Sequence, residues 1–146
     1  MKILFYDTKS YDREFFEKLL PSYPGIEIKF IEANIHEETA ALAHGYDAIC
    51  AFVNADLGAP VIEELHRQGV KLILMRCAGY NNVDLETSAK CGIQVARVPG
   101  YSPEAVAEHA MALALTANRH THKAYIKCRE NNFALNGLMG VNFYQK

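Results

Sequence analysis

Stretches with the hydrophobic pattern of strands alternate with stretches with that of amphipathic helices along the first two thirds of the chain. Short, nearly continuous apolar runs occupy residues 3–6, 47–53 and 70–75, and residues 93–98 are expected to form the last strand. Residues 26–30 instead alternate apolar with charged side chains, as a half-buried edge strand does. Continuous apolar runs of this length are typical of strands that are covered on both faces of a parallel sheet. The pattern therefore predicts a parallel sheet of about five strands.

Amphipathic stretches separate these strands, and we expect each of them to form a helix. They cover residues 11–20, 36–44, 59–68 and 85–90. Pro21 closes the first helix, and Gly69 and Gly92 terminate the last two. Asp84 is placed to cap the helix that follows it. Because strand and helix alternate, we expect a doubly wound α/β domain with helices on both faces of its sheet.

The composition changes at Pro103. Ser102 is placed to cap a helix there, and proline suits the first helical turn. Residues 105–125 are rich in alanine, leucine and methionine, which predicts one long helix. Residues 126–146 carry scattered apolar groups without a regular period. The C-terminal part is therefore expected to be a long helix followed by an irregular arm.

The composition narrows the class of protein. A formal net charge of −2, from 15 basic and 17 acidic side chains, offers no broad positive surface, so we expect no nucleic-acid partner. The four cysteines form no Cys-x-x-Cys pair and have no histidine spacing suited to zinc, which predicts reduced thiols and no metal site. No window suits a signal peptide or a membrane span. We therefore expect a soluble, cytoplasmic protein with no membrane partner.

Ligands of doubly wound sheets collect at the carboxyl ends of the strands, and the most informative loop there is residues 76–82. Ala78 and Gly79 are small, so successive backbone N–H groups are free to converge on an anion. Arg76 is expected to raise the local positive potential. An ordinary strand-to-helix turn explains the same spacing, and the sequence alone leaves both interpretations open.

Two aromatic residues belong to loops at the carboxyl ends of the predicted strands. Tyr101 stands between Gly100 and the predicted helix start, where its ring and hydroxyl are placed to lean over the same crevice or to pack on the surface. Phe52, at the end of the third strand, suits either the core or a ligand contact. Its place beside the other loops favours the contact.

Two long motifs carry a family resemblance. Arg76-Cys-Ala-Gly-Tyr-Asn-Asn-Val-Asp84, followed by Val98-Pro-Gly-Tyr-Ser-Pro-Glu-Ala-Val-Ala-Glu-His109, resembles the NAD-dependent D-2-hydroxyacid dehydrogenases, most closely the D-lactate dehydrogenases. The likeness extends over essentially the whole chain, including residues 119–125 and 129–133. It implies a flavodoxin-like sheet domain and a reaction between pyruvate and D-lactate.

The resemblance also implies roles for individual residues. The backbone amides of Ala78 and Gly79 would bind the carboxylate of a small 2-keto or 2-hydroxy acid, with Tyr101 closing over it. Phe52 matches an aromatic residue that lines the substrate pocket; some relatives have tyrosine there, so only an apolar wall transfers. Val106 matches a helix position that packs beside the nicotinamide in some relatives.

The implied cofactor is NAD, and the implied catalytic arginine, glutamate and histidine lie in a second domain of the full-length enzyme. The nine glycines of this chain never adopt the Gly-x-Gly-x-x-Gly spacing of a dinucleotide loop, and Gly137-Leu-Met-Gly140 comes nearest. His109, inside the predicted helix, fits a packing role better than an acid/base role. We therefore expect no NAD bound to this chain, no catalytic residue in it, and no activity from it alone.

The resemblance divides the chain in two. Residues 1–100 would form the flavodoxin-like substrate domain, and residues 101–146 an inter-domain helix and dimerisation arm at the start of a missing cofactor domain. The apolar surface of residues 103–146 would then need a cover, which predicts a homodimer or an exchanged oligomer.

The alternative is a flavodoxin-like binding or association module without catalysis. A phospho-acceptor domain requires an aspartate after the third strand and a lysine after the fifth, where this chain has Phe52 and Val98-Pro99. A flavin-binding module requires a longer, Ser/Thr-rich loop after the first strand, where this chain has Asp7-Thr8-Lys9-Ser10. Both differences favour the dehydrogenase interpretation.

Overall fold

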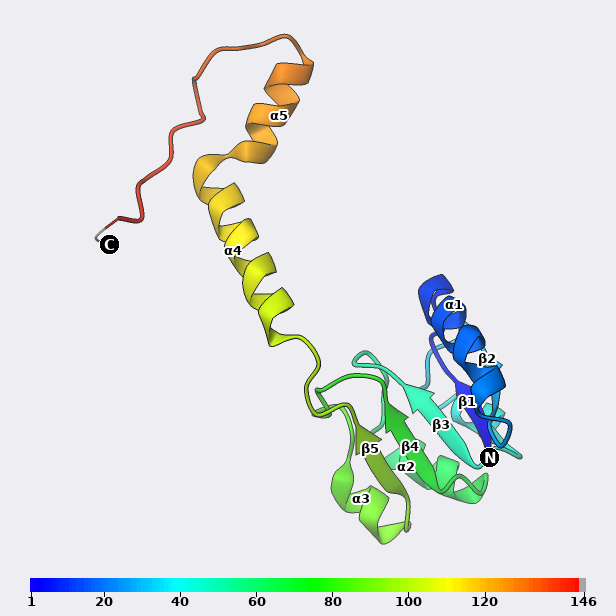
Figure 1. Ribbon diagram of the computed structural model, residues 1–146. Helices are drawn as coiled ribbons and strands as arrows, with labels where there is room; N and C mark the ends of the chain where they lie inside the picture. Colours follow the sequence, from blue (N-terminus) through cyan, green and yellow to red (C-terminus); the bar gives the residue numbers. More distant parts are fainter. Residues whose placement is uncertain (145–146) are drawn as a thin grey trace. The chain divides into compact units, whose positions relative to one another are not determined.

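The chain forms two compact units, Met1–Tyr101 and the segment that begins at Ser102. The computed structural model describes residues 1–144 (Figure 1), so the last two residues of the predicted arm, 145 and 146, lie outside the described part. Among the described residues, no helix is long and apolar enough to cross a membrane.

The first unit is built on a five-stranded sheet in which every strand is parallel to its neighbours. The strands are β1 (Lys2–Phe5), β2 (Glu27–Phe30), β3 (Ala48–Ala51), β4 (Leu72–Met75) and β5 (Gln94–Arg97). Their order is β2-β1-β3-β4-β5 (Figure 1), the flavodoxin-like order of a doubly wound sheet. The predicted fold class is therefore confirmed.

Helices cover both faces of this sheet. They are α1 (Ser10–Leu19), the short 3-10 turns η1 (Leu20–Ser22) and η2 (Ala40–Ala43), α2 (Ala59–Arg67) and α3 (Leu85–Lys90). On one face, Ile3, Phe5 and Cys50 cluster with Phe16 of α1, and the two phenyl centroids lie 5.0 Å apart. The opposite face is the larger core, which includes residues of η2 and α2 such as Ile62. The alternation of side chains along each strand separates the two clusters.

The helix ends follow the predicted signals. Gly69 and Gly92, with φ of +89° and +68°, follow α2 and α3 in the left-handed region that glycine tolerates best. The Asp84 side chain caps α3 by accepting a hydrogen bond of 2.9 Å from the Thr87 amide. Pro21 lies in η1, immediately after α1 ends.

The prediction of a helix over residues 36–44 is wrong, because only the single turn η2 forms there. Thr39 Oγ1 accepts a hydrogen bond of 3.0 Å from the His36 amide and donates one of 2.8 Å to the Asn34 carbonyl. Such local side-chain bonds offer the backbone an alternative to the helical ladder.

The second unit contains two helices, α4 (Pro103–Arg119) and α5 (Thr121–Arg129), so the prediction of one helix over 105–125 is also wrong. The break is His120, whose φ of +49° is left-handed and ends the helical ladder of α4. Histidine is among the non-glycine residues that enter this region most often, so the helix ends here without the glycine or proline that would have predicted the break. Ser102 is the N-cap residue of α4, but its side chain makes no capping hydrogen bond.

The side chain of Asn118, on α4, bonds to the arm after α5. Asn118 Oδ1 accepts a hydrogen bond of 2.9 Å from the Val141 amide, and Asn118 Nδ2 donates one of 2.7 Å to the Val141 carbonyl. A Cβ on Gly140 would overlap the Asn118 carbonyl oxygen. The glycine at 140 is therefore explained by this close approach of two backbone segments.

Candidate functional site

The site lies at the carboxyl edge of the sheet, where the loops after β1, β3, β4 and β5 meet. Its central element is the bend of residues 76–82, which follows β4. Ala78 is half-buried and Gly79 is exposed. A Cβ built on Gly79 would meet nothing within 4 Å, so the space in front of the bend is open.

The carbonyl groups of the bend are engaged by the protein. The Cys77 carbonyl accepts a hydrogen bond of 3.2 Å from the Val98 amide, and the Ala78 carbonyl accepts one of 3.1 Å from Arg97 Nη1. The Gly79 carbonyl accepts one of 3.3 Å from the Cys77 thiol. Burial raises the pKa of that thiol, against an opposing effect of Arg76, so the sulfur keeps the proton that it donates.

The amide groups of the bend are not engaged in the same way. Within residues 1–144, neither the Ala78 nor the Gly79 N–H donates a hydrogen bond to another protein group. All peptide bonds here are trans, so the N–H and C=O of one peptide unit point in opposite directions. Because the carbonyls of both peptide units are held by Arg97 and Val98, both N–H groups point away from those partners. Both N–H groups are therefore without a protein acceptor among residues 1–144.

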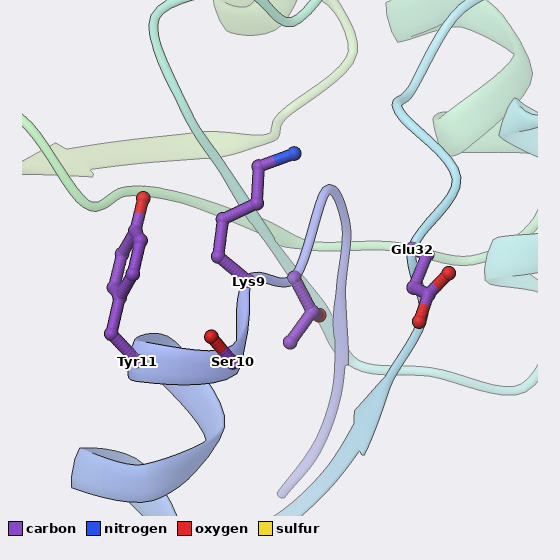
Figure 2. A pocket seen from close by; sticks show the side chains of 5 residues that line it. Lys9, Ser10, Tyr11 and Glu32 are labelled. Carbon is purple, nitrogen blue, oxygen red and sulfur yellow. The ribbon is translucent and has the colours of Figure 1, made fainter.

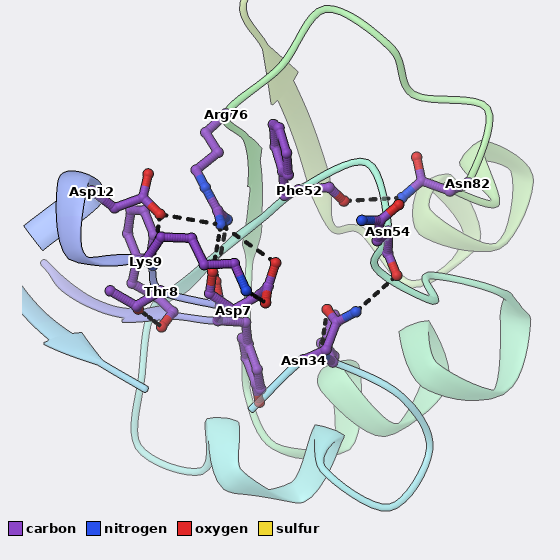
Figure 3. Close-up of polar contacts among 12 residues, drawn as sticks. Asp7, Thr8, Lys9, Asp12, Asn34, Phe52, Asn54, Arg76 and Asn82 are labelled. Carbon is purple, nitrogen blue, oxygen red and sulfur yellow. Dashed lines mark hydrogen bonds and ion pairs between the residues drawn. The ribbon is translucent and has the colours of Figure 1, made fainter. Parts of the chain in front are cut away.

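Phe52 stands beside the bend and is fixed through both its backbone and its ring. Asn82 Nδ2 donates a hydrogen bond of 3.3 Å to the Phe52 carbonyl (Figure 3) and one of 2.9 Å to the Ala55 carbonyl. The Arg76 guanidinium lies 4.8 Å from the centre of the Phe52 ring. The ring is half-buried, so it belongs partly to the core and partly to the open edge.

Arg76 is tied to the loop after β1 by ion pairs and hydrogen bonds. Its side chain is only 11% exposed, and Nη2 lies 3.5 Å from a carboxylate oxygen of Asp12 and 3.9 Å from one of Asp7 (Figure 3). It also donates hydrogen bonds of 3.2 and 2.8 Å to the carbonyls of Tyr6 and Asp7. Arg76 thus braces the loop after β1, and its charge still opposes the rise in the pKa of the Cys77 thiol in the bend.

The cation that contacts the bend is Arg97, which the sequence pattern did not single out. Its Nη1 donates to the Pro99 carbonyl at 3.2 Å as well as to the Ala78 carbonyl, and its guanidinium lies 5.0 Å from the centre of the Tyr80 ring. The signal was its place at the end of the last strand, directly before the second motif. Arg97 thereby ties the bend to the loop that carries Tyr101.

The other predicted residues are exposed. Tyr101 ends the first unit with 69% of its surface exposed, and the neighbouring Pro99 carbonyl is held next to the bend by Arg97. Val106 lies on α4 in the second unit, also 69% exposed. The structure therefore brings together the loops of Ala78, Gly79 and Phe52, and connects them to the loop of Tyr101.

An open hollow of about 670 Å³ lies where β1 leads into α1. Figure 2 shows Lys9, Ser10, Tyr11 and Glu32 around it. The Lys9 ammonium is paired with Asp7 at 2.6 Å, so it is not available as an unshared cation for an anionic ligand.

The described residues do not fit a dinucleotide. The loop between β1 and α1 is Tyr6-Asp7-Thr8-Lys9, which has no glycine to admit a pyrophosphate and places a carboxylate where the phosphates would lie. Gly140 serves the contact with Asn118 described above. Among residues 1–144, no group of three or more His, Cys, Asp or Glu side chains is placed to hold a metal ion.

The structure defines a doubly wound α/β domain, and its candidate site is formed by the loops after β3, β4 and β5. The chain belongs to the D-isomer specific 2-hydroxyacid dehydrogenase family, whose catalytic-domain model matches residues 3–137. The resemblance inferred from the two motifs is thus confirmed.

Individual relatives and solved structures agree with this family assignment. The chain is similar to a D-lactate dehydrogenase of Escherichia coli, with 47% identity over 146 residues, all of this chain and 44% of that protein. The apo structure of D-lactate dehydrogenase from E. coli aligns with a TM-score of 0.85 at 48% identity, over 97% of this chain and 44% of that one. D-Lactate dehydrogenase from Aquifex aeolicus, complexed with NAD and lactic acid, aligns with a TM-score of 0.74 at 25% identity, over 96% and 41%. The chain thus spans less than half the length of these relatives.

Proposed function

We propose that residues 1–101 bind the carboxylate of a small 2-keto or 2-hydroxy acid, pyruvate or D-lactate, as the substrate side of a D-lactate dehydrogenase. The Ala78 and Gly79 amides donate to the carboxylate, Phe52 provides an apolar wall, and Tyr101 closes over the ligand. Relatives named as D-lactate dehydrogenases, one of them complexed with lactic acid, support this choice of ligand.

The observation that carries the proposal is the pair of N–H groups of Ala78 and Gly79. The carbonyls in the same two peptide units, those of Cys77 and Ala78, already accept hydrogen bonds from Val98 and Arg97. A carboxylate accepts two N–H groups at once, and hydrogen bonds to a charged acceptor are stronger than neutral ones. Holding the two peptide units before the ligand arrives lowers the cost of ordering them on binding. Phe52 has no hydroxyl, so its part is limited to apolar contact with the acyl group.

The proposal of a nicotinamide cofactor for the whole enzyme rests only on the relatives. NAD supplies the hydride in such enzymes, and the protein supplies orientation and charge. Because the described residues do not fit a dinucleotide, we assign none of them to catalysis, and Val106 is proposed only as a contact beside the nicotinamide. The free thiols of Cys50, Cys77, Cys91 and Cys128 favour a reducing compartment, so the proposed setting is the cytoplasm.

The 146-residue chain is expected to bind pyruvate and neither to bind NADH nor to reduce pyruvate. Calorimetry with pyruvate should give a saturable isotherm, and the fluorescence of NADH should stay unchanged on addition of the chain. The reason is that the amide pair is complete while no dinucleotide loop is present in the sequence. Saturable NADH binding would contradict the assignment, and an absence of pyruvate binding would favour an association module without catalysis.

A second proposal concerns assembly. We propose that residues 103–146 pair with a second copy of this chain, in a homodimer or an exchanged oligomer. No residue of α4 or α5 is buried, and large apolar side chains are exposed along this segment. These are Val106, Met111, Leu113, Leu115, Tyr125, Ile126, Phe133, Leu135, Met139, Val141, Phe143 and Tyr144. Apolar surface of this extent on one segment is typical of an interface.

Light scattering is expected to give twice the mass of the chain. Replacing Met111 and Leu115 of α4 by glutamate should shift the mass towards that of one chain, because each charge would be buried against apolar groups in the dimer. The matched control replaces Leu42 and Val53, exposed residues of the first unit, in the same way. A monomer at high concentration for the unaltered chain would remove the proposal.

A further inference from the structure

Arg97 is the last residue of β5, and its side chain contacts residues outside that strand. One nitrogen, Nη1, donates to the Ala78 carbonyl at 3.1 Å and to the Pro99 carbonyl at 3.2 Å. The guanidinium stacks on the Tyr80 ring at 5.0 Å from its centre. Within residues 1–144, Arg97 forms no ion pair, so these three contacts account for its placement.

The contact with Ala78 controls a particular peptide unit. The Ala78 carbonyl and the Gly79 N–H belong to the same trans peptide, so holding the oxygen on Arg97 directs the N–H to the opposite side. Glycine at 79 permits many backbone conformations, so this peptide has little intrinsic preference for that orientation. A flipped peptide would present a carbonyl oxygen, instead of a donor, to an incoming carboxylate.

The neighbouring peptide unit provides an internal comparison. The Ala78 N–H shares its peptide with the Cys77 carbonyl, which is held by the backbone amide of Val98 at 3.2 Å. No side chain is needed for that bond. The orientation of the Ala78 amide is therefore independent of Arg97, whereas the orientation of the Gly79 amide depends on it.

We propose that Arg97 is a positioning residue for carboxylate binding: it orients the Gly79 amide towards the ligand and, through Pro99, holds the loop of Tyr101 against the bend. This inference rests on the proposed function, because it assigns Arg97 a part in that same site. Arg97 acts through the peptide units that it holds, and its charge is not required to touch the ligand.

The test is a pyruvate titration of the isotope-labelled 146-residue chain, followed by the amide resonances of Ala78 and Gly79. Arg97→Met keeps an apolar side chain of similar length and removes every donor. The matched control is Arg13→Met, which removes the same charge from an exposed arginine that also stacks on a ring, Phe30, at 5.0 Å. Circular dichroism checks that each variant is folded.

Arg97→Met is expected to weaken pyruvate binding roughly tenfold, the effect of losing one hydrogen bond to a charged group. At saturation the Gly79 shift should be largely lost while the Ala78 shift persists, and Arg13→Met should change neither. If both saturated shifts survive and only the affinity falls, Arg97 acts by charge and the inference is overturned. Loss of both shifts together also overturns it, since the two peptides would then not be independent. An unaltered chain with no saturable shift at either amide would instead refute the proposed function itself.

Discussion

Replacing Arg76 by methionine is expected to lower the free energy of unfolding by about 3 kcal/mol. The guanidinium lies near two largely buried carboxylates, Asp7 and Asp12, whose side chains are 16% and 10% exposed. Methionine would leave Asp12 without its cation, while Asp7 would keep only its pair with Lys9 at 2.6 Å. It would also release the Tyr6 and Asp7 carbonyls, which Arg76 holds at 3.2 and 2.8 Å.

Arg76 has a further effect on the backbone of the loop after β1. Asp7 adopts a left-handed φ of +51°, a region that aspartate enters more readily than most non-glycine residues but that still has to be stabilised. The hydrogen bond from Arg76 to its carbonyl helps to stabilise that conformation. The loss is therefore expected to exceed that of an ordinary surface ion pair.

Urea denaturation followed by circular dichroism measures this difference. Arg13→Met is the control, because its partner Glu17 is exposed and pairs of that kind contribute about 0.5 kcal/mol. Equal losses for the two variants would show that Arg76 is no more than a surface charge. The expected order is a large loss for Arg76 and a small one for Arg13.

The second large effect is expected at alkaline pH and depends on Cys50. Burial raises the pKa of this thiol from its ordinary value of 9.0 to about 12, with Arg76 opposing the shift. A thiol whose pKa is raised on folding stabilises the native state fully below the unfolded value, and that stability is lost as pH rises towards the folded value. Between about pH 9 and about pH 12 the free energy of unfolding should therefore fall steadily as pH rises, on account of the Cys50 thiol.

Cys50→Ala is expected to make the dependence of stability on pH shallower over this range. Tyr6, whose pKa burial also raises, will continue to destabilise the variant above its ordinary value of 10.0. Cys128→Ala, at an exposed cysteine of α5, is the matched control and should leave the slope unchanged. The measurement is a series of urea denaturations at increasing pH, and parallel curves for the Cys50 variant and the unaltered chain would refute the account.

The sequence was sufficient for the sheet because its signals are local. Apolar runs, Gly69, Gly92 and Asp84 each act within a few residues, and the structure has the strands and helix ends at those places. His120 and Thr39 escaped prediction for a related reason. Histidine and threonine occur both inside helices and at their ends. The residue type alone therefore does not predict that His120 adopts a left-handed conformation or that the Thr39 side chain bonds to the backbone.

The partners of the two arginines could not be predicted in the same way. Arg76 bonds to a carbonyl 70 positions away, and Arg97 to one 19 positions away. Which arginine is offset by carboxylates and which reaches the bend depends on how β1 and β5 flank the central strands. The small residues at 78 and 79 predicted a candidate bend, but the engagement of their carbonyls became apparent only from the fold.

The most direct test of the central claim is a pyruvate titration of the unaltered, isotope-labelled chain in which every backbone amide is followed. We predict saturable shifts that are largest at Ala78 and Gly79, with smaller ones at Phe52. Shifts that are absent, or that are largest at the hollow lined by Lys9 and Glu32, would contradict the assignment of the carboxylate to the bend after β4.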